Sequence, residues 1–151
     1  MNSAPISLSR NRTASKNYII TDTYTAGIKL TGNEVKSIRS GRAILNGSFI
    51  SLHNGELWLR NAYIGHYTPA GKMAEGAERR DRKILVHKAE LRLLLMRHEA
   101  ERLTMIPLDL HSTKRRVKLS FALARGKRKH EKRAEIKKRE VDREIRRALK
   151  N

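Results

Sequence analysis

The chain has 151 residues, of which 34 are lysine or arginine and 15 are aspartate or glutamate, so its formal net charge at pH 7 is +19. It has no cysteine, which excludes a disulfide scaffold, a thiolate metal site and a cysteine nucleophile. The length is sufficient for one domain with a hydrophobic core, and so large a positive charge indicates a polyanionic partner, most simply a nucleic acid.

The first part of the chain combines a polar end, an extended segment and a short helix. Residues 1–12 are rich in serine and asparagine, which predicts a flexible N-terminal arm without regular structure. Residues 16–30 contain many β-branched and aromatic side chains, so a strand is expected there. Between Thr31 and Gly41, a capping residue, two apolar residues three apart and a glycine stop predict a short helix.

The middle of the chain contains two predicted hairpins. Residues 48–61 are expected to form the first, because Asn54-Gly55 is the strongest signal for a two-residue turn. Residues 65–83 are polar and basic, which predicts a long loop. A short strand at 84–86, a helix at 88–102 and a second hairpin at 103–124 complete this part. The pattern predicts a mainly β fold with helices, a closed antiparallel β-barrel of the oligonucleotide-binding (OB) type, over residues 13–126.

The end of the chain is a basic tail, residues 127–151. From residue 125 onward there are 13 basic and 5 acidic side chains. The apolar residues of the tail follow a helical spacing, but they form only a thin stripe and the like charges repel. We therefore expect the tail to be disordered when free and to become a helix on a polyanion.

The sequence lacks the common motifs of catalytic, phosphate-binding and metal sites. No GxSxG, Walker or GxGxxG motif is present, and the six histidines form neither an HExxH motif nor a pair four residues apart. The prediction is a protein that is not an enzyme and that uses no metal and no cofactor. The longest aliphatic run, residues 93–96, is too short to cross a membrane.

Basic segments at the arm, in the long loop and in the tail indicate a protein that meets phosphate on more than one side. A surface for stacking bases is a weaker expectation. Trp58, Phe49 and Phe121 lie on predicted strands, where a place in the core is favoured over such a surface.

Four segments together resemble one protein family. They are Asn11-Arg12-Thr13-Ala14, residues 30–41, residues 82–87 and residues 123–133. In order and spacing they resemble the bacterial SsrA-binding proteins, also called small protein B. The resemblance covers residues 11–151 and implies an OB-type β-barrel with helices. It also implies a non-enzymatic RNA-binding adaptor of trans-translation, the rescue of stalled ribosomes, in the cytoplasm.

The resemblance further implies a set of partners. Members of the family bind the tRNA-like domain of transfer-messenger RNA (tmRNA, or SsrA RNA). With elongation factor Tu and GTP, they help to deliver the alanyl-charged RNA to the A site of a stalled 70S ribosome. The tail is implied to be helical there, in the empty mRNA channel beyond the decoding centre. No membrane partner is implied, and the high charge favours a monomer when the protein is free.

Candidate site residues carry over from the family by position. The RNA-binding positions are Asn11, Arg12, Lys36, Arg39, Leu85, His87 and Lys118. The ribosome-binding positions of the tail are Lys127, Arg128, Lys129, His130, Lys132 and Arg133. Leu85 is equally well explained as a core residue of a strand, and Glu34 either orients Lys36 or Arg39 or helps the helix to start. Thr25 stands where the family usually has glutamate.

Three other functions stay open. A general RNA-binding or ribosomal protein would carry the same charge but would not prefer tRNA-like RNA. A basic helix could instead dock on an anionic membrane or on a calmodulin-like partner. An RNA-processing enzyme is the least favoured, because no acid–base pair can be named.

Overall fold

The computed structural model describes residues 5–67, 71 and 75–150. The elements at the start are β1 (Ile6–Arg10), α1 (Ala14–Asn17), β2 (Tyr18–Ile28) and α2 (Gly32–Arg39). The central ones are β3 (Ala43–Ile44), β4 (Phe49–His53), β5 (Glu56–Arg60), β6 (Tyr63–Ile64), the 3-10 turn η2 (Ala77–Arg79) and β7 (Arg82–Leu85). The chain ends with α3 (Lys88–Ala100), β8 (Thr104–Thr113), β9 (Arg116–Gly126) and α4 (Lys129–Lys150).

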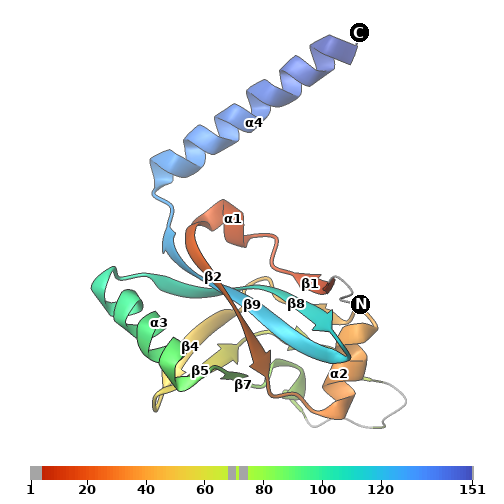
Figure 1. Ribbon diagram of the computed structural model, residues 1–151. Helices are drawn as coiled ribbons and strands as arrows, with labels where there is room; N and C mark the ends of the chain where they lie inside the picture. Colours follow the sequence, from red (N-terminus) through yellow and green to blue (C-terminus); the bar gives the residue numbers. More distant parts are fainter. Residues whose placement is uncertain (1–4, 68–70, 72–74, 151) are drawn as a thin grey trace.

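Seven of the strands form one antiparallel sheet in the order β1-β8-β9-β2-β7-β5-β4, while β3 and β6 pair separately. The long strands β2 and β9 pair along most of their length and cross the middle of the molecule (Figure 1). The sheet curls, and β4 packs close to β8 although the two are far apart in the strand order. The fold is therefore mainly β with a few helices at its borders.

The predicted closed barrel is wrong as far as the described strands are concerned. The hydrogen-bonded order has two ends, β1 and β4, and these strands are not paired with each other. One edge of β8 is bonded to β9, and β1 occupies the other from Asp109 to Ser112. Among the described strands, β4 lies close to β8 but is not paired with it, so the sheet stays open.

The predicted flexible arm is also wrong for the part of it that forms a strand. Ile6–Arg10 pair with β8 as an edge strand, and the hydroxyl of Ser9 donates to the carbonyl oxygen of Ala43 at 2.9 Å. Leu8 packs against the core. The remainder of the predicted arm includes residues 1–4, which lie outside the described residues.

The local predictions of the hairpin and of the first helix are confirmed. Asn54 and Gly55 both have positive φ, 50° and 72°, as a type I′ turn between β4 and β5 requires. α2 begins after Thr31, whose side chain accepts a hydrogen bond from the Glu34 N–H, and ends before Gly41, which has φ of 81°. The second hairpin is also confirmed, with positive φ at Lys114 and Arg115.

The core lies on the concave face of the sheet. Alternate residues of the strands point into it, and α2 and α3 add Ile38 and Leu94, which are fully buried. A smaller apolar cluster on the opposite face of β8 and β9 is covered by Ala14 of α1. A fully buried leucine or isoleucine, such as Ile38 or Leu94, contributes about 1.5–3 kcal/mol relative to its exposed state. α2, α3 and α1 are thus held in place by the sheet itself.

The aromatic prediction is confirmed for one residue of three. Phe121 is fully buried and stacks on Tyr24. Phe49 is 47% exposed, and Trp58 is only partly buried. Both point away from the core, because their strand neighbours Ile50, Leu57 and Leu59 occupy the inner face.

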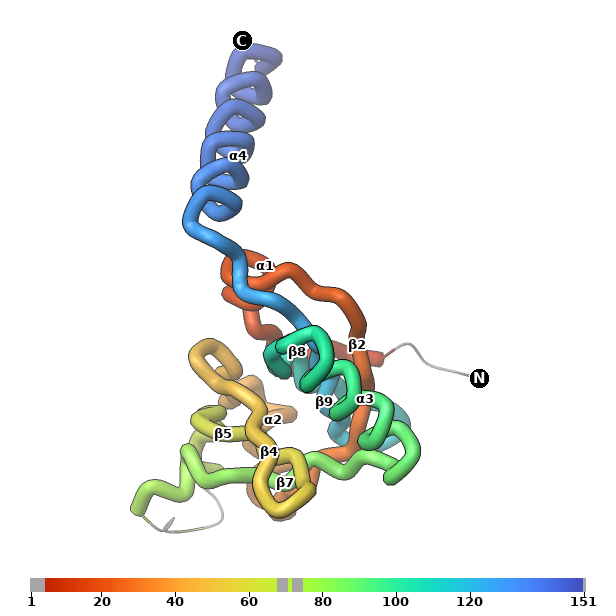
Figure 2. The backbone as a smooth tube through the Cα atoms, turned by 90° about the vertical axis from the view of Figure 1, so that its left-hand side faces the viewer, coloured from red at the N-terminus to blue at the C-terminus, as the bar shows by residue number. Residues whose placement is uncertain are grey.

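α4 extends away from the rest of the molecule as a single helix of 22 residues (Figures 1 and 2). The helical spacing predicted for the tail is therefore present. None of its described side chains is buried, and four large apolar ones are exposed: Ile136, Val141, Ile145 and Leu149. Packing against the domain does not stabilise this helix, so its disorder in the free protein stays a prediction.

Candidate nucleic-acid interface

A group of exposed cations on the domain lies where the end of α2 meets the turn between β8 and β9. We call it the α2–turn cluster, and it consists of Lys36, Arg39, Lys114, Arg115 and Arg116. The guanidinium of Arg39 donates to the carbonyl oxygen of Arg115 at 2.6 Å, which ties the helix to the turn. The ammonium of Lys36 lies 5.4 Å from the centre of the Tyr67 ring. The cluster is therefore a fixed group of positive charge suited to contact phosphates.

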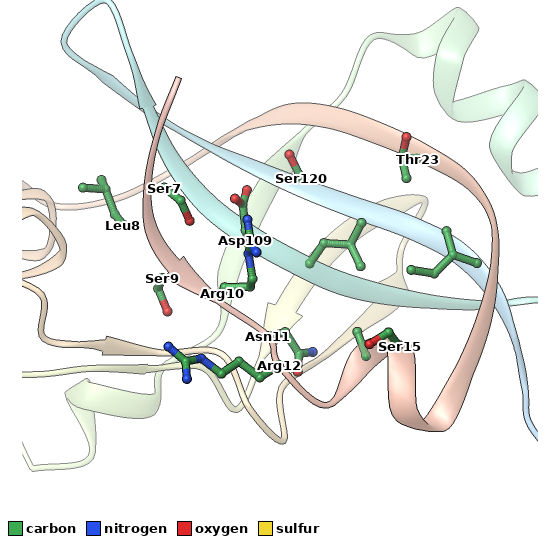
Figure 3. Close-up of a pocket in the computed structure, with 13 residues that line it drawn as sticks. Ser7, Leu8, Ser9, Arg10, Asn11, Arg12, Ser15, Thr23, Asp109 and Ser120 are labelled. Atoms are coloured by element: carbon green, nitrogen blue, oxygen red, sulfur yellow. The ribbon is translucent and has the colours of Figure 1, made fainter. Parts of the chain in front are cut away.

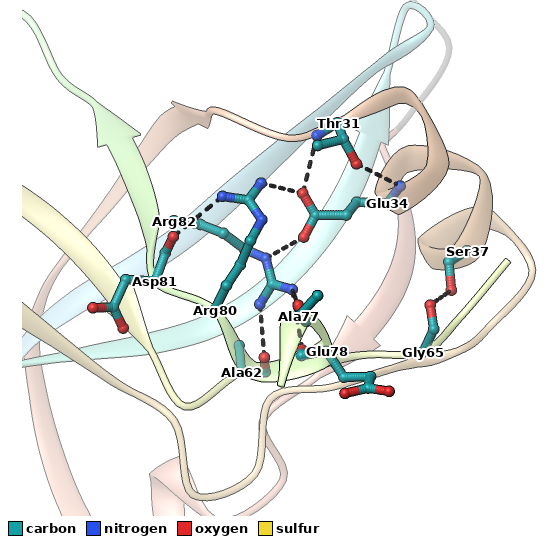
Figure 4. A network of polar contacts seen from close by, with 10 residues as sticks. All are labelled: Thr31, Glu34, Ser37, Ala62, Gly65, Ala77, Glu78, Arg80, Asp81 and Arg82. Atoms are coloured by element: carbon teal, nitrogen blue, oxygen red, sulfur yellow. Dashed lines mark hydrogen bonds and ion pairs between the residues drawn. The ribbon is translucent and has the colours of Figure 1, made fainter. Parts of the chain in front are cut away.

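A buried ion-pair network holds α2 in this position (Figure 4). The N–H of Thr31 donates to one carboxylate oxygen of Glu34 at 3.0 Å, which completes a capping box. Arg80 pairs with the same oxygen, and Nε of Arg82 lies 2.5 Å from the other. The side chains of Arg82 and Glu34 are 0% and 5% exposed. Glu34 therefore starts the helix and anchors it, instead of orienting Lys36 or Arg39.

Arg82 links α2 to the segment that follows the long loop. Besides the pair with Glu34, its guanidinium donates to the carbonyl oxygens of Ala62 at 2.7 Å and Glu78 at 3.1 Å. Burial lowers the pKa of Arg82, and the hydrogen bond from its side chain to Glu34 opposes that shift. All three contacts keep the guanidinium charged and satisfied inside the protein.

A row of three residues crosses the convex face of the sheet near this cluster. Leu85 of β7 is paired with Gly27 of β2, which is paired with Lys118 of β9. Leu85 is 51% exposed, so the core interpretation of this residue is wrong. A Cβ at Gly27 would lie 3.5 Å from the Leu85 Cβ, which is ordinary van der Waals contact, so Leu85 packs directly beside Gly27. Lys118 lies two residues from Arg116, and the row therefore borders the α2–turn cluster.

His87 is the N-cap residue of α3 and is exposed, two residues beyond Leu85. It lines a groove of about 500 Å³ together with Leu85 and Lys83. The structure therefore brings together five of the predicted RNA-binding positions, Lys36, Arg39, Leu85, His87 and Lys118, on adjoining elements. Their role in RNA binding stays a prediction.

Asn11 and Arg12 lie apart from this group, between β1 and α1. The amide of Asn11 donates to the carbonyl oxygen of Pro107 at 2.9 Å, and its oxygen accepts from the Thr13 N–H and hydroxyl at 3.3 and 2.9 Å. Its side chain is thus engaged within the protein and fastens the chain entering α1 to β8. Arg12 is exposed and lines a groove of about 950 Å³ beside Arg10 (Figure 3).

This structural role of Asn11 gives a testable expectation. Asn11→Ala should lower the free energy of unfolding by about 1–2 kcal/mol, because it removes these hydrogen bonds and leaves the Pro107 carbonyl without its side-chain donor. Urea denaturation measures the change. The salt dependence of RNA binding should stay as in the parent protein. Arg12→Gln is the matched control, with near-parent stability; weaker RNA binding by Asn11→Ala at unchanged stability would contradict this assignment.

Asp109 and Ser120, which line the same groove, both contact His111, but the geometry of the three residues differs from that of a catalytic triad. The carboxylate of Asp109 lies 3.0 Å from Nδ1 of His111, and the hydroxyl of Ser120 lies 3.3 Å from the same nitrogen. In a triad, serine and aspartate bind opposite nitrogens of the ring, so that a proton can pass through it. Here no such relay exists. Within the described residues, no three metal-ligating side chains converge either.

The root of the tail is fixed by Lys127. Its N–H donates to the carbonyl oxygen of Asn17 at 2.8 Å, and its ammonium donates to that of Ser15 at 2.6 Å. The same ammonium lies 2.5 Å from a carboxylate oxygen of Glu135 in α4, and this hydrogen bond lowers the pKa of Glu135. Arg125 adds a second ion pair, to Glu131 at 3.3 Å. The start of α4 is thereby bound to α1 and β9.

The other predicted tail residues, Arg128, Lys129, His130, Lys132 and Arg133, lie just beyond this root, and all but Lys132 are exposed. Three residues of the α2–turn cluster are absent from the predicted site: Lys114, Arg115 and Arg116. Their consecutive positive charges at a hairpin turn were the signal that could have identified them.

A curled antiparallel sheet with an exposed basic surface defines a class of small nucleic-acid-binding domains. The chain matches the SmpB protein family over residues 8–151. It belongs to that family. Within the described residues, no helix is both long enough and apolar enough to span a membrane.

Similar proteins cover almost the whole chain. It is 45% identical over 141 residues to the SsrA-binding protein of Nostoc punctiforme, a match that covers 93% of this chain and 91% of that protein. It is 46% identical over 145 residues to the SsrA-binding protein of Thermobifida fusca, covering 96% and 90%. A solved structure described as "tmRNA-SmpB: a journey to the center of the bacterial ribosome" is 45% identical, with a TM-score of 0.64, over 80% of this chain and 84% of that one.

Proposed function

We propose that this chain is a non-enzymatic RNA-binding adaptor of trans-translation that binds tmRNA and acts on stalled ribosomes. The observation that carries the proposal is the match to the SmpB family from residue 8 to residue 151, which includes both the domain and the tail. The relatives are named SsrA-binding proteins, and the similar solved structure is described as tmRNA-SmpB with the bacterial ribosome. The net charge of +19 is consistent with RNA as the partner.

The domain supplies selective binding to the tRNA-like domain of tmRNA in this proposal. The α2–turn cluster and the row of Leu85, Gly27 and Lys118 form a fixed surface on which phosphates and sugars are positioned. Its architecture is of the OB type, although the sheet is open. The rigid anchoring of α2 through Glu34 and Arg82 supports recognition of RNA shape rather than of charge alone.

The tail supplies the contact with the ribosome. Residues 127–151 occupy the empty mRNA channel of the stalled 70S ribosome as a helix, and they are disordered when the protein is free. Arg128, Lys129, Lys132 and Arg133 contact ribosomal phosphates at the decoding centre, and the ring of His130 stacks on a base. The ammonium of Lys127 instead holds the root of the tail through Ser15 and Glu135. Elongation factor Tu with GTP joins through the charged RNA. The free protein is a cytoplasmic monomer.

Competition between two RNAs tests the proposal. The protein is titrated with the tRNA-like domain of tmRNA and with an equal mass of unrelated structured RNA, across a series of salt concentrations. Selectivity that persists at high salt is expected, because shape-specific contacts are screened less than charge alone. A steep, equal loss of affinity for both RNAs would indicate a general RNA-binding protein instead.

The cluster itself is tested in the same assay by Lys36→Gln. If Lys36 contacts one phosphate, the slope of log affinity against log salt should fall by about 0.7–0.9, with a uniform loss of affinity. Arg92→Gln is the matched control, since Arg92 is also exposed and lies on α3 outside the cluster. An unchanged slope for Lys36→Gln would remove Lys36 from the interface.

A further inference from the structure

The convex face of β4, β5 and β7 carries an unusual set of side chains. In the strand register, Ser51 of β4 is opposite Trp58 of β5, and Trp58 is opposite Lys83 of β7. Phe49 is opposite Arg60 in the same hairpin. Because residues that alternate along a strand share a face, these five side chains point to the same side, away from the core. We call this set the outer aromatic face.

Core packing does not account for the two aromatic residues. Leu57 and Leu59, the neighbours of Trp58, are 1% and 0% exposed and fill the inner side of β5. Phe49 is 47% exposed on an edge strand, where a polar residue would suffice. An aromatic pair held on the solvent side of a rigid hairpin is a surface that a planar ligand can contact.

Two polar atoms of the outer aromatic face lack hydrogen-bond partners. Neither the Ser51 hydroxyl nor the Trp58 indole nitrogen has a hydrogen-bond partner in the described part of the chain, although both atoms are shielded from solvent. An indole N–H is only a donor, and a hydroxyl is both donor and acceptor. Both groups therefore have hydrogen-bonding capacity that the described part of the protein leaves unused.

The charges around this face cancel. The ammonium of Lys83 lies 2.8 Å from a carboxylate oxygen of Glu56. Nε of Arg60 lies 3.6 Å from a carboxylate oxygen of Asp81. The outer aromatic face thus differs from the α2–turn cluster, in which positive charge accumulates. Its ligand must gain from stacking and hydrogen bonds rather than from attraction to phosphate.

We propose that Trp58 and Phe49 form a stacking site for an unpaired RNA base. Diagonal neighbours on a sheet lie about 7–8 Å apart, which leaves room for one planar ring in contact with both aromatic side chains. Ser51, which is opposite Trp58 in the strand register, supplies the hydroxyl of this face that can bind an edge of that base. Lys83 is two residues from Leu85 on the same strand, so an RNA on the row of Leu85, Gly27 and Lys118 reaches this site. The site rests on the proposed RNA-binding function and extends it.

Trp58 is the only tryptophan in the chain, so its fluorescence reports on this site alone. The full-length protein is titrated with unstructured hexanucleotides and, separately, with the tRNA-like domain of tmRNA. Quenching of Trp58 emission by hexanucleotides is the expected result. Phe49→Leu, which keeps an apolar side chain, is expected to weaken hexanucleotide binding by about fivefold or more with no change in the salt slope.

Two controls keep the result interpretable. Ile44→Ala removes a side chain that is also exposed, 53%, but lies on β3 outside the face, and it should bind as the parent does. Urea denaturation of each variant checks that the fold is intact. Unquenched Trp58 at saturating RNA, or parent affinity in Phe49→Leu, would overturn the stacking site. Those results would leave the proposed function standing if the protein still bound tmRNA selectively. If Trp58 were quenched but the protein did not prefer tmRNA, the proposed function would be overturned and the stacking site would stand.

Discussion

Glu34→Gln is expected to lower the free energy of unfolding by about 3–5 kcal/mol, because it leaves the guanidinium of Arg82 buried without its anionic partner. The glutamine can still cap Thr31, so the loss comes mainly from the ion pairs with Arg80 and Arg82. Urea denaturation followed by circular dichroism measures the change. Glu56→Gln is the matched control. Its pair with Lys83 is 42% and 36% exposed, and about 1 kcal/mol or less is expected there.

The same carboxylate makes stability depend on pH. Burial raises the pKa of Glu34, but hydrogen bonds from Arg80, the Thr31 N–H and Arg82 more than offset this, and the pKa is lowered from its ordinary value of 4.5. Since the folded state binds this proton less tightly than the unfolded state, the stabilisation is complete above 4.5 and is lost as the pH falls through the folded pKa. On acidification, the free energy of unfolding should therefore fall less in Glu34→Gln than in the parent protein, because the variant has no carboxylate at this position to protonate. If Glu34→Gln had the same free energy of unfolding as the parent protein at every pH, the ion-pair network would not stabilise the fold.

Removing residues 127–151 is expected to abolish ribosome rescue while leaving selective binding to the tRNA-like domain intact. No side chain of α4 is buried, so the domain should remain folded. The affinity for any RNA should fall moderately, because the removed segment is strongly basic. Rescue is measured by tagging of a stalled translation product in a reconstituted system, and RNA binding by the competition described above.

A second truncation, after Arg128, separates two causes of a defect. It retains Lys127 and its bonds to the carbonyl oxygens of Asn17 and Ser15, so α1 keeps its contacts. Loss of rescue in both truncations with RNA selectivity retained would support the tail's role. Normal rescue by either shortened chain would show that the tail does not act on the ribosome.

Local sequence patterns predicted the elements whose structure is decided locally. Asn54-Gly55 specifies its own turn, and Thr31 with Glu34 specifies the start of α2. The spacing of apolar residues in the tail indicated a helix where α4 lies, although we expected that helix only on a polyanion. In each case the residues that determine the conformation lie within a few positions of one another.

Long-range pairing accounts for the errors. Ile6–Arg10 have a polar composition, and they form a strand because β8 offers a free edge. Whether the sheet closes is decided in the same way, by which distant strands pair, and β4 contacts β8 without pairing with it. The buried role of Arg82 could not be predicted, because it depends on Glu34, which lies 48 positions earlier in the chain.

The candidate site was predictable only in part for the same reason. The family resemblance gave positions without contacts. Asn11 has its side chain engaged inside the protein, and Leu85 is exposed despite a strand pattern typical of the core. The α2–turn cluster arises from the approach of α2 to the distant turn at Arg115, which no local pattern encodes.

The contacts at Lys127 set the direction in which α4 leaves the domain. A helix of 22 residues is about 33 Å long, so a tilt of about 10° at its first turn displaces the far end by about 6 Å. That direction depends on two ion pairs, Lys127 with Glu135 and Arg125 with Glu131, which reach only the first turns of the helix. A phosphate that drew either cation away would therefore change the direction of the whole tail while the domain stayed still.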